Sequence, residues 1–88
     1  DSRLLLRQVM SKLKSSGWKI GNLDCTVCAE NPKLRTFIEQ MRDNLATDLE
    51  TEMSNVSVKA TTEEGLGISG SGAGMSATAV VLLMPAVE

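Results

Sequence analysis

Two threonines and two glutamates in a row, Thr61-Thr62-Glu63-Glu64, are the residues of this chain best suited to chemistry. The residues before them alternate between apolar and polar types, which predicts a strand that ends at Ala60. Hydroxyls at a strand end can donate to phosphate oxygens, and a neighbouring carboxylate can hold Mg²⁺, which prefers oxygen ligands. A strand end followed by a solvated acidic turn is the alternative, and residue types alone leave both interpretations open.

A glycine pattern follows directly, because Gly65, Gly67 and Gly70 spell G-x-G-x-x-G. In a dinucleotide-binding fingerprint these glycines lead from a strand into a helix, and an acidic residue follows about 20 positions later. Here a β-like run follows, only 18 residues remain after Gly70, and the chain has no Gly-Lys-Ser/Thr of a Walker loop. We therefore expect the glycines to turn the chain back into a last strand.

The two cysteines, Cys25 and Cys28, have the C-x-x-C spacing of redox and zinc sites. Their neighbours predict a strand, on which residues three apart point to opposite faces. A zinc site would also need further Cys or His ligands, whereas the chain has two Cys and no His. We expect two reduced, partly buried thiols that behave as small apolar residues.

Two amphipathic helices are predicted from apolar residues at helical spacing. The first covers residues 2–16, with Asp1 or Ser2 as its N-cap and Gly17 as its stop. The second starts at Asn31-Pro32, where the asparagine can cap and the proline ring fits the first helical position. The two apolar stripes consist of Leu5, Leu6, Val9, Met10 and Leu13, and of Leu34, Ile38, Met41, Leu45 and Leu49.

Three strands are predicted over residues 18–29, 55–60 and 75–84. The first is expected to bend near Gly21-Asn22 and to place Leu23, Cys25 and Val27 on one face. The last is apolar on both faces from Ala79 onward, which suits an interior strand or one that another subunit covers. The order α-β-α-β-loop-β predicts an α+β fold of two layers, a mixed β-sheet with both helices packed on one face.

Length and charge narrow the classes of function. With 88 residues and a net charge of −2, the chain is expected to be a single domain, 1–88, that gains stability by oligomerising. No basic block suggests nucleic acid as a partner. No membrane association is expected, because the longest apolar stretch, residues 77–87, is shorter than the about 20 residues of a membrane span. No signal peptide is recognised at the start of the chain.

Three blocks of the sequence resemble the 2-C-methyl-D-erythritol 2,4-cyclodiphosphate synthase family. Residues 55–70, NVSVKATTEEGLGISG, are similar to the family signature N-V-x-x-K-A-T-T-x-E-x-L-G-F-T-G. Residues 1–7, DSRLLLR, resemble D-S-x-x-L-L, and residues 21–34, GNLDCTVCAENPKL, resemble G-N-x-D-x-T-x-x-A-E-x-P-K-L. The blocks keep the family's order and spacing, so the resemblance implies the C-terminal, nucleotide-binding half of a family domain.

The resemblance implies a phosphorus-oxygen lyase of the non-mevalonate isoprenoid pathway. Members of that family cyclise 4-diphosphocytidyl-2-C-methyl-D-erythritol 2-phosphate: a phosphate of the substrate attacks the β-phosphorus of the cytidine diphosphate, and CMP leaves. They are homotrimers with active sites between neighbouring subunits, and they use a divalent ion such as Mg²⁺ or Mn²⁺ together with Zn²⁺. The expected location is a bacterial cytoplasm or a plastid stroma.

By the same resemblance, the site residues follow two of the predicted strands. The residues that match the cytosine-holding loop, chiefly through backbone groups, are Ala29, Glu30, Asn31, Pro32, Lys33 and Leu34. Ala60, Thr61 and Thr62 match the segment that holds the diphosphate, and its two threonines are the catalytic candidates. Glu64 matches the acid that binds the divalent ion between the phosphates, whereas Glu63 falls at a variable position and receives no role.

The chain departs from the family pattern in three places. The family's zinc is held by an Asp-x-His pair and a further His, and this chain has no His, so the 88 residues alone are expected to be inactive. Ser71 and Ala73 stand at the Arg and Glu positions of the family's R-G-E-G, and Ile68 replaces a Phe. These departures motivate a second hypothesis, a non-catalytic, family-derived structural subunit that assembles with other chains.

Overall fold

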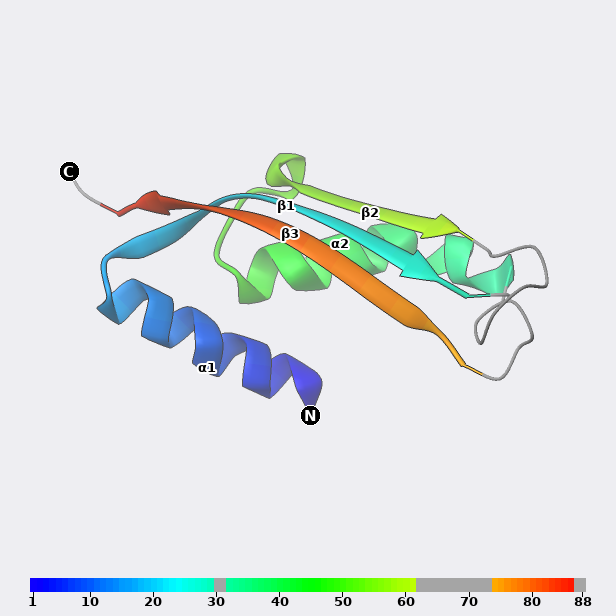
Figure 1. Ribbon diagram of the computed structural model, residues 1–88, viewed down its shortest axis with the longest axis horizontal. Helices are drawn as coiled ribbons and strands as arrows, with labels where there is room; N and C mark the ends of the chain where they lie inside the picture. Colours follow the sequence, from blue (N-terminus) through cyan, green and yellow to red (C-terminus); the bar gives the residue numbers. More distant parts are fainter. Residues whose placement is uncertain (30–31, 62–73, 87–88) are drawn as a thin grey trace.

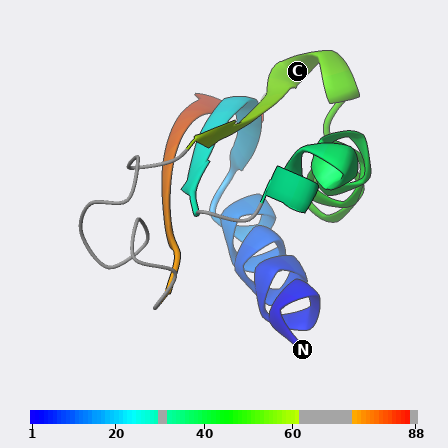
Figure 2. The same ribbon diagram turned by 90° about the vertical axis from the view of Figure 1, so that its right-hand side faces the viewer.

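The computed structural model describes residues 1–29, 32–61 and 74–86, with residues 32 and 33 described by their backbone alone. The elements are α1 (Ser2–Ser15), β1 (Trp18–Cys28), the 3-10 helix η1 (Pro32–Phe37), α2 (Ile38–Asp48), the 3-10 helix η2 (Met53–Asn55), β2 (Val56–Thr61) and β3 (Ser76–Pro85). Both α-helices lie on the same face of the sheet (Figures 1 and 2). The predicted two-layer α+β fold is confirmed.

The strand order of the sheet is β2-β1-β3. β1 and β2 run parallel, with Leu23 opposite Val56 and Cys28 opposite Thr61. β3 runs antiparallel to β1, and its first residue, Ser76, also lies opposite Cys28. The ends of β1 and β2 and the start of β3 therefore meet at one end of the sheet, which we call the carboxyl end.

β1 is irregular where the sequence predicted a bend. The register between β1 and β3 shifts between Ile20 and Asn22. A Cβ added at Gly21 would lie 2.9 Å from side-chain atoms of Met84 and 3.2 Å from the carbonyl oxygen of Leu82. A glycine at this irregularity lets β3 approach the backbone of β1 closely.

The ends of α1 follow from its first residue and the glycine after it. The backbone N–H of Arg3 donates to Oδ1 of Asp1 at 2.9 Å, which confirms Asp1 as the N-cap. Gly17 has a φ of 85°, and its N–H donates to the carbonyl of Lys14 at 3.0 Å. Glycine adopts this left-handed conformation without steric cost and therefore ends the helix.

The second helix begins later than the sequence predicted. Residues Pro32–Phe37 form 3-10 turns, and α-helical geometry starts at Ile38. η1 runs directly into α2, Phe37 at the junction makes no side-chain capping hydrogen bond, and Thr36 beside it is a weak helix former. None of the helices in the described part of the chain is long and apolar enough to cross a membrane.

α2 ends in a Schellman motif in which the left-handed residue is not a glycine. Glu50 takes a left-handed φ of 55°, its N–H donates to Thr47, and the N–H of Thr51 donates to the carbonyl of Ala46 at 3.0 Å. This pair of bonds satisfies carbonyls that the helix leaves open. The sequence gives no signal for this turn because glycine is the usual residue at such a position.

The core lies between the two α-helices and the face of the sheet that they cover. Its buried members are Met10, Ile20, Leu23, Ala46, Leu49, Val56 and Val58. Leu5 and Val9 belong to the predicted apolar stripe of α1, but they are 62% and 52% exposed. Nothing among the described residues covers that side of α1.

An apolar groove of about 360 Å³ runs between α1 and β3, and Val9, Leu13, Val81 and Leu83 are among its lining residues. All residues of β3 are exposed, and within the described residues this strand pairs with β1 alone. Within the described residues β3 is thus an edge strand, so of the two predicted alternatives the structure does not show an interior strand here, and cover by another subunit stays a prediction. Its apolar side chains still require a cover.

Arg42 of α2 holds the start of β2. Its Nε donates to the carbonyl of Val56 at 2.8 Å, and its Nη2 donates to the carbonyl of Met53 at 2.7 Å. Its Nη1 also pairs with Glu39 at 2.9 Å, on the exposed side of the helix. The planar donors of one guanidinium thereby join α2 to the backbone where β2 begins.

We predict that Arg42→Met lowers the free energy of unfolding by about 2 kcal/mol, because two charge-assisted hydrogen bonds to backbone carbonyls are lost. Glu39→Gln is the matched control: it removes only the exposed ion pair and is expected to cost less than about 0.5 kcal/mol. Urea denaturation followed by circular dichroism measures both changes. Equal losses in the two variants would show that the carbonyl contacts do not stabilise the fold.

Asp48 joins the end of α2 to the start of α1. Arg3 donates from Nε to Oδ2 at 2.7 Å and from Nη2 to Oδ1 at 2.9 Å, and Nη1 of Arg7 lies 3.7 Å from Oδ1. The Asp48 side chain is 1% exposed. The hydrogen bonds from Arg3 hold the pKa of this carboxyl below its ordinary value, although its desolvation acts in the opposite direction.

A lowered pKa in the folded state makes this contribution to stability depend on pH. It is fully present above the unfolded-state pKa of about 4 and is lost as the pH falls through the folded-state pKa. We predict that Asp48→Asn is less stable than the wild type at neutral pH. The difference between the urea midpoints of the wild type and the variant is expected to become smaller below about pH 4. A gap that stayed constant down to strongly acidic pH would contradict the assignment to Asp48.

Candidate functional site

The carboxyl end of the sheet brings together the two segments that the sequence assigns to the site. The backbone N–H of Ala29, just after β1, donates to the carbonyl of Thr61 at 3.0 Å. Ala29 is buried, whereas Thr61, the last residue of β2, is exposed. η1 starts at the same end, as Figure 2, which looks onto this end, shows. The segments meet because parallel strands end on the same side of a sheet.

The other predicted site residues divide into those that the structure describes and those that it does not. Leu34 in η1 and Ala60 in β2 are half-buried near the carboxyl end. Pro32 and Lys33 form the first residues of η1. Four predicted site residues lie outside the described residues: Glu30, Asn31, Thr62 and Glu64. The glycines of residues 65–70 and the departures from the family pattern at Ile68, Ser71 and Ala73 lie outside them as well.

The face of the sheet turned away from the helices, here called the open face, is polar along β1 and β2. The side chains on it are Asp24, Thr26 and Cys28 of β1 and Ser57, Lys59 and Thr61 of β2. Nζ of Lys59 lies 3.7 Å from Oδ2 of Asp24. The sequence did not predict this ion pair, because only the register between the strands shows that Lys59 and Asp24 are neighbours.

The residues present do not fit a zinc site. Within the described residues, no three side chains of the His, Cys, Asp or Glu type gather into a group that could hold a metal ion. The chain has no His, and its two Cys point to opposite faces of β1. Magnesium has different requirements, since it often binds through one or two carboxylates together with substrate phosphates.

Both cysteines lie within the described residues as half-buried thiols, in agreement with the prediction. Cys25 packs against the core, and Cys28 lies on the open face at the carboxyl end. Burial, together with the negative charge of Asp24, raises the pKa of the Cys25 thiol. This thiol therefore stays protonated at neutral pH and behaves as a small apolar group.

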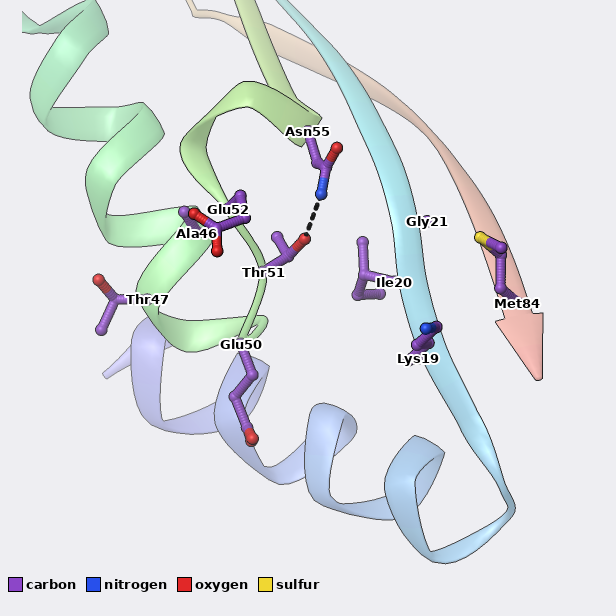
Figure 3. Close-up of a pocket in the computed structure, with 10 residues that line it drawn as sticks. All are labelled: Lys19, Ile20, Gly21, Ala46, Thr47, Glu50, Thr51, Glu52, Asn55 and Met84. Carbon is purple, nitrogen blue, oxygen red and sulfur yellow. Dashed lines mark hydrogen bonds between the residues drawn. The ribbon is translucent and has the colours of Figure 1, made fainter. Parts of the chain in front are cut away.

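A polar pocket of about 690 Å³ lies at the other end of the molecule, between the start of β1 and the end of α2 (Figure 3). Lys19 and Glu50 line it, and Nδ2 of Asn55 donates to Oγ1 of Thr51 at 3.0 Å. Glu50 already pairs with Lys14 at 2.8 Å. Of the described site residues predicted from the sequence, none lines this pocket, so the candidate site remains at the carboxyl end.

Known proteins match this chain along almost its whole length. The YgbB family model matches residues 1–84. The 2-C-methyl-D-erythritol 2,4-cyclodiphosphate synthase of Pseudomonas entomophila is 50% identical over 86 residues, which are 98% of this chain and 55% of the relative. The enzyme of the same name from a Geobacillus species is 53% identical over 83 residues, 94% of this chain and 52% of the relative. The chain thus spans about half the length of the curated relatives it matches.

Solved structures show the same fold. IspF of Plasmodium falciparum in its CDP complex has a TM-score of 0.90 and 32% identity, over 97% of this chain and 55% of that chain. The 2C-methyl-D-erythritol 2,4-cyclodiphosphate synthase of Plasmodium vivax has a TM-score of 0.92 and 32% identity, over 97% and 57%. With its fold, its three sequence blocks and these matches in agreement, the chain belongs to the YgbB family of 2-C-methyl-D-erythritol 2,4-cyclodiphosphate synthases.

Proposed function

We propose that this chain is the C-terminal half of a 2-C-methyl-D-erythritol 2,4-cyclodiphosphate synthase domain and supplies the part that binds cytidine diphosphate and Mg²⁺. The enzyme would cyclise 4-diphosphocytidyl-2-C-methyl-D-erythritol 2-phosphate and release CMP. The observation that carries the proposal is the hydrogen bond between Ala29 and Thr61, which joins the cytosine segment to the diphosphate segment. The names of the relatives and the CDP complex of the Plasmodium falciparum protein support it.

In this proposal, the two segments have separate tasks. Residues 29–34 hold the cytosine through backbone groups at the end of β1 and the start of η1. The hydroxyls of Thr61 and Thr62 donate to the diphosphate and hold the β-phosphorus in place while the substrate's own phosphate approaches it. Glu64 would hold Mg²⁺ or Mn²⁺, which neutralises charge on the phosphoryl oxygens when bound.

We also propose that the 88 residues alone are inactive, with the zinc ligands supplied by the part of the family domain that this chain does not span. The lack of His supports this, as does the exposed apolar groove between α1 and β3, which the rest of a domain would cover. A purely structural subunit is less favoured, because the named relatives are synthases. The bacterial sources of these relatives favour a bacterial cytoplasm over a plastid stroma as the proposed location.

Titration with CDP and Mg²⁺ tests the proposed site. We expect the wild type to bind CDP, and we expect Thr62→Ala and Glu64→Ala each to weaken binding about tenfold, the effect of losing one interaction of about 1.4 kcal/mol. Isothermal titration calorimetry measures the affinities. Thr47→Ala is the matched control, because Thr47 is an exposed threonine at the opposite end of the molecule.

Removal of the metal separates the roles of the two residues. Chelation of Mg²⁺ is expected to weaken CDP binding by the wild type and by Thr62→Ala, and to leave Glu64→Ala unchanged. If the wild type does not bind CDP, or if both variants bind it as tightly as the wild type, the proposed function is wrong.

For the quaternary structure we propose a homotrimer in which the open face of β3 is buried between subunits. Val80 and Leu82 on that face are 68% and 55% exposed in the single chain. Leu82→Asp is expected to reduce the assembly to smaller species, as measured by light scattering after size-exclusion chromatography. Leu4→Asp is the control, since Leu4 on α1 is 51% exposed. An equal effect of both substitutions would contradict assembly through β3.

A further inference from the structure

The ion pair between Lys59 and Asp24 lies on the open face, next to the proposed diphosphate site. The distance between Nζ of Lys59 and Oδ2 of Asp24 is 3.7 Å, and the two side chains are 59% and 56% exposed. Exposed pairs of this kind contribute little to stability and do not hold their long side chains in one position. Lys59 is therefore available to a stronger anionic partner.

The register of the strands shows in which direction the Lys59 side chain extends to reach Asp24. Lys59 lies opposite Thr26, whereas Asp24 lies opposite Ser57, one step earlier on the same face. The pair therefore runs diagonally across the two strands, away from the carboxyl end. In this arrangement Asp24 draws the ammonium group away from Thr61.

Thr61 is the next residue of β2 on the same face as Lys59. Two residues of a parallel strand span about 6.6 Å, and lysine carries its charge on a flexible four-carbon stem. Rotation of the Lys59 side chain toward the carboxyl end thus moves its ammonium group to the hydroxyl of Thr61, where the diphosphate is proposed to bind.

We propose that Lys59 is a further phosphate-binding residue, which leaves Asp24 and pairs with the diphosphate when the nucleotide binds. The inference rests on the proposed function. Its physical basis is charge: the chain has a net charge of −2, and Asp24 on the open face repels a second anion. An ammonium group beside the diphosphate offsets this repulsion and forms a charge-assisted hydrogen bond. Asp24 competes with the ligand for the same cation.

Comparison of CDP with cytidine, which lacks phosphates, tests this role by calorimetry. Lys59→Met is expected to weaken CDP binding about tenfold, the value of one charge-assisted hydrogen bond, and to leave cytidine binding unchanged. Lys59→Arg keeps the positive charge and should retain most of the CDP affinity. Lys59→Gln repeats the test with a polar side chain, and the melting temperature of each variant verifies that it folds.

A double-mutant cycle with Asp24→Asn separates competition from simple repulsion. If Asp24 competes for the ammonium group, its replacement tightens CDP binding more when Lys59 is present than in the Lys59→Met background. If Asp24 only repels the diphosphate, the gain is equal in both backgrounds, and that result would overturn the proposed exchange.

The outcomes distinguish this inference from the function on which it rests. A wild type that binds no CDP overturns both. If the wild type, Lys59→Met and Lys59→Gln all bind CDP equally well, the proposed site stands but Lys59 is not part of it, and the inference is overturned. Parallel losses of cytidine and CDP affinity in both variants would assign Lys59 a structural role and would also overturn the inference.

Discussion

The parallel pairing of β1 with β2 is the constraint on which the rest of this structure depends. Residues 23–28 pair with residues 56–61 in an unbroken register. A parallel pair requires a long crossover, and η1, α2 and η2 form it here. Because the two strands run in one direction, their last residues meet, and the Ala29 to Thr61 bond extends the contact beyond the ladder. The meeting of two distant sequence segments is thus a result of topology.

Directional contacts keep the crossover in place on the sheet. Burial of the core residues stabilises the two layers, but the hydrophobic effect has no direction and does not by itself prevent one layer from sliding on the other. Arg42 donates to the carbonyl of Met53 in η2 and to that of Val56, the first residue of β2, and Asp48 accepts two hydrogen bonds from Arg3 of α1. The first contact sets the position of α2 along β2, and the second sets α1 against the end of α2.

Features marked by a residue type with a strong local preference could be predicted from the sequence, and features without such a residue or dependent on strand register could not. Asp1 caps α1 and Gly17 ends it for reasons contained in a few residues, whereas the left-handed turn at Glu50 has no glycine to mark it. Residue types left the function of Thr61 open, and the family blocks were needed to connect it with Ala29. No local pattern links Lys59 to Asp24, because their contact requires knowledge of the strand pairing.

β3 exposes apolar side chains on both of its faces, and each face needs a separate layer to cover them. Val81 and Leu83 line the groove beside α1, on the helix side of the sheet, while Val80 and Leu82 lie on the open face. A single added layer covers one face of a sheet, so a cover for the groove leaves the open face exposed. The rest of a family domain suits the groove, and neighbouring subunits suit the open face. A second layer on the open face would lie beside the polar side chains of β1 and β2, and in the proposed trimer the nucleotide site would therefore lie next to a subunit contact.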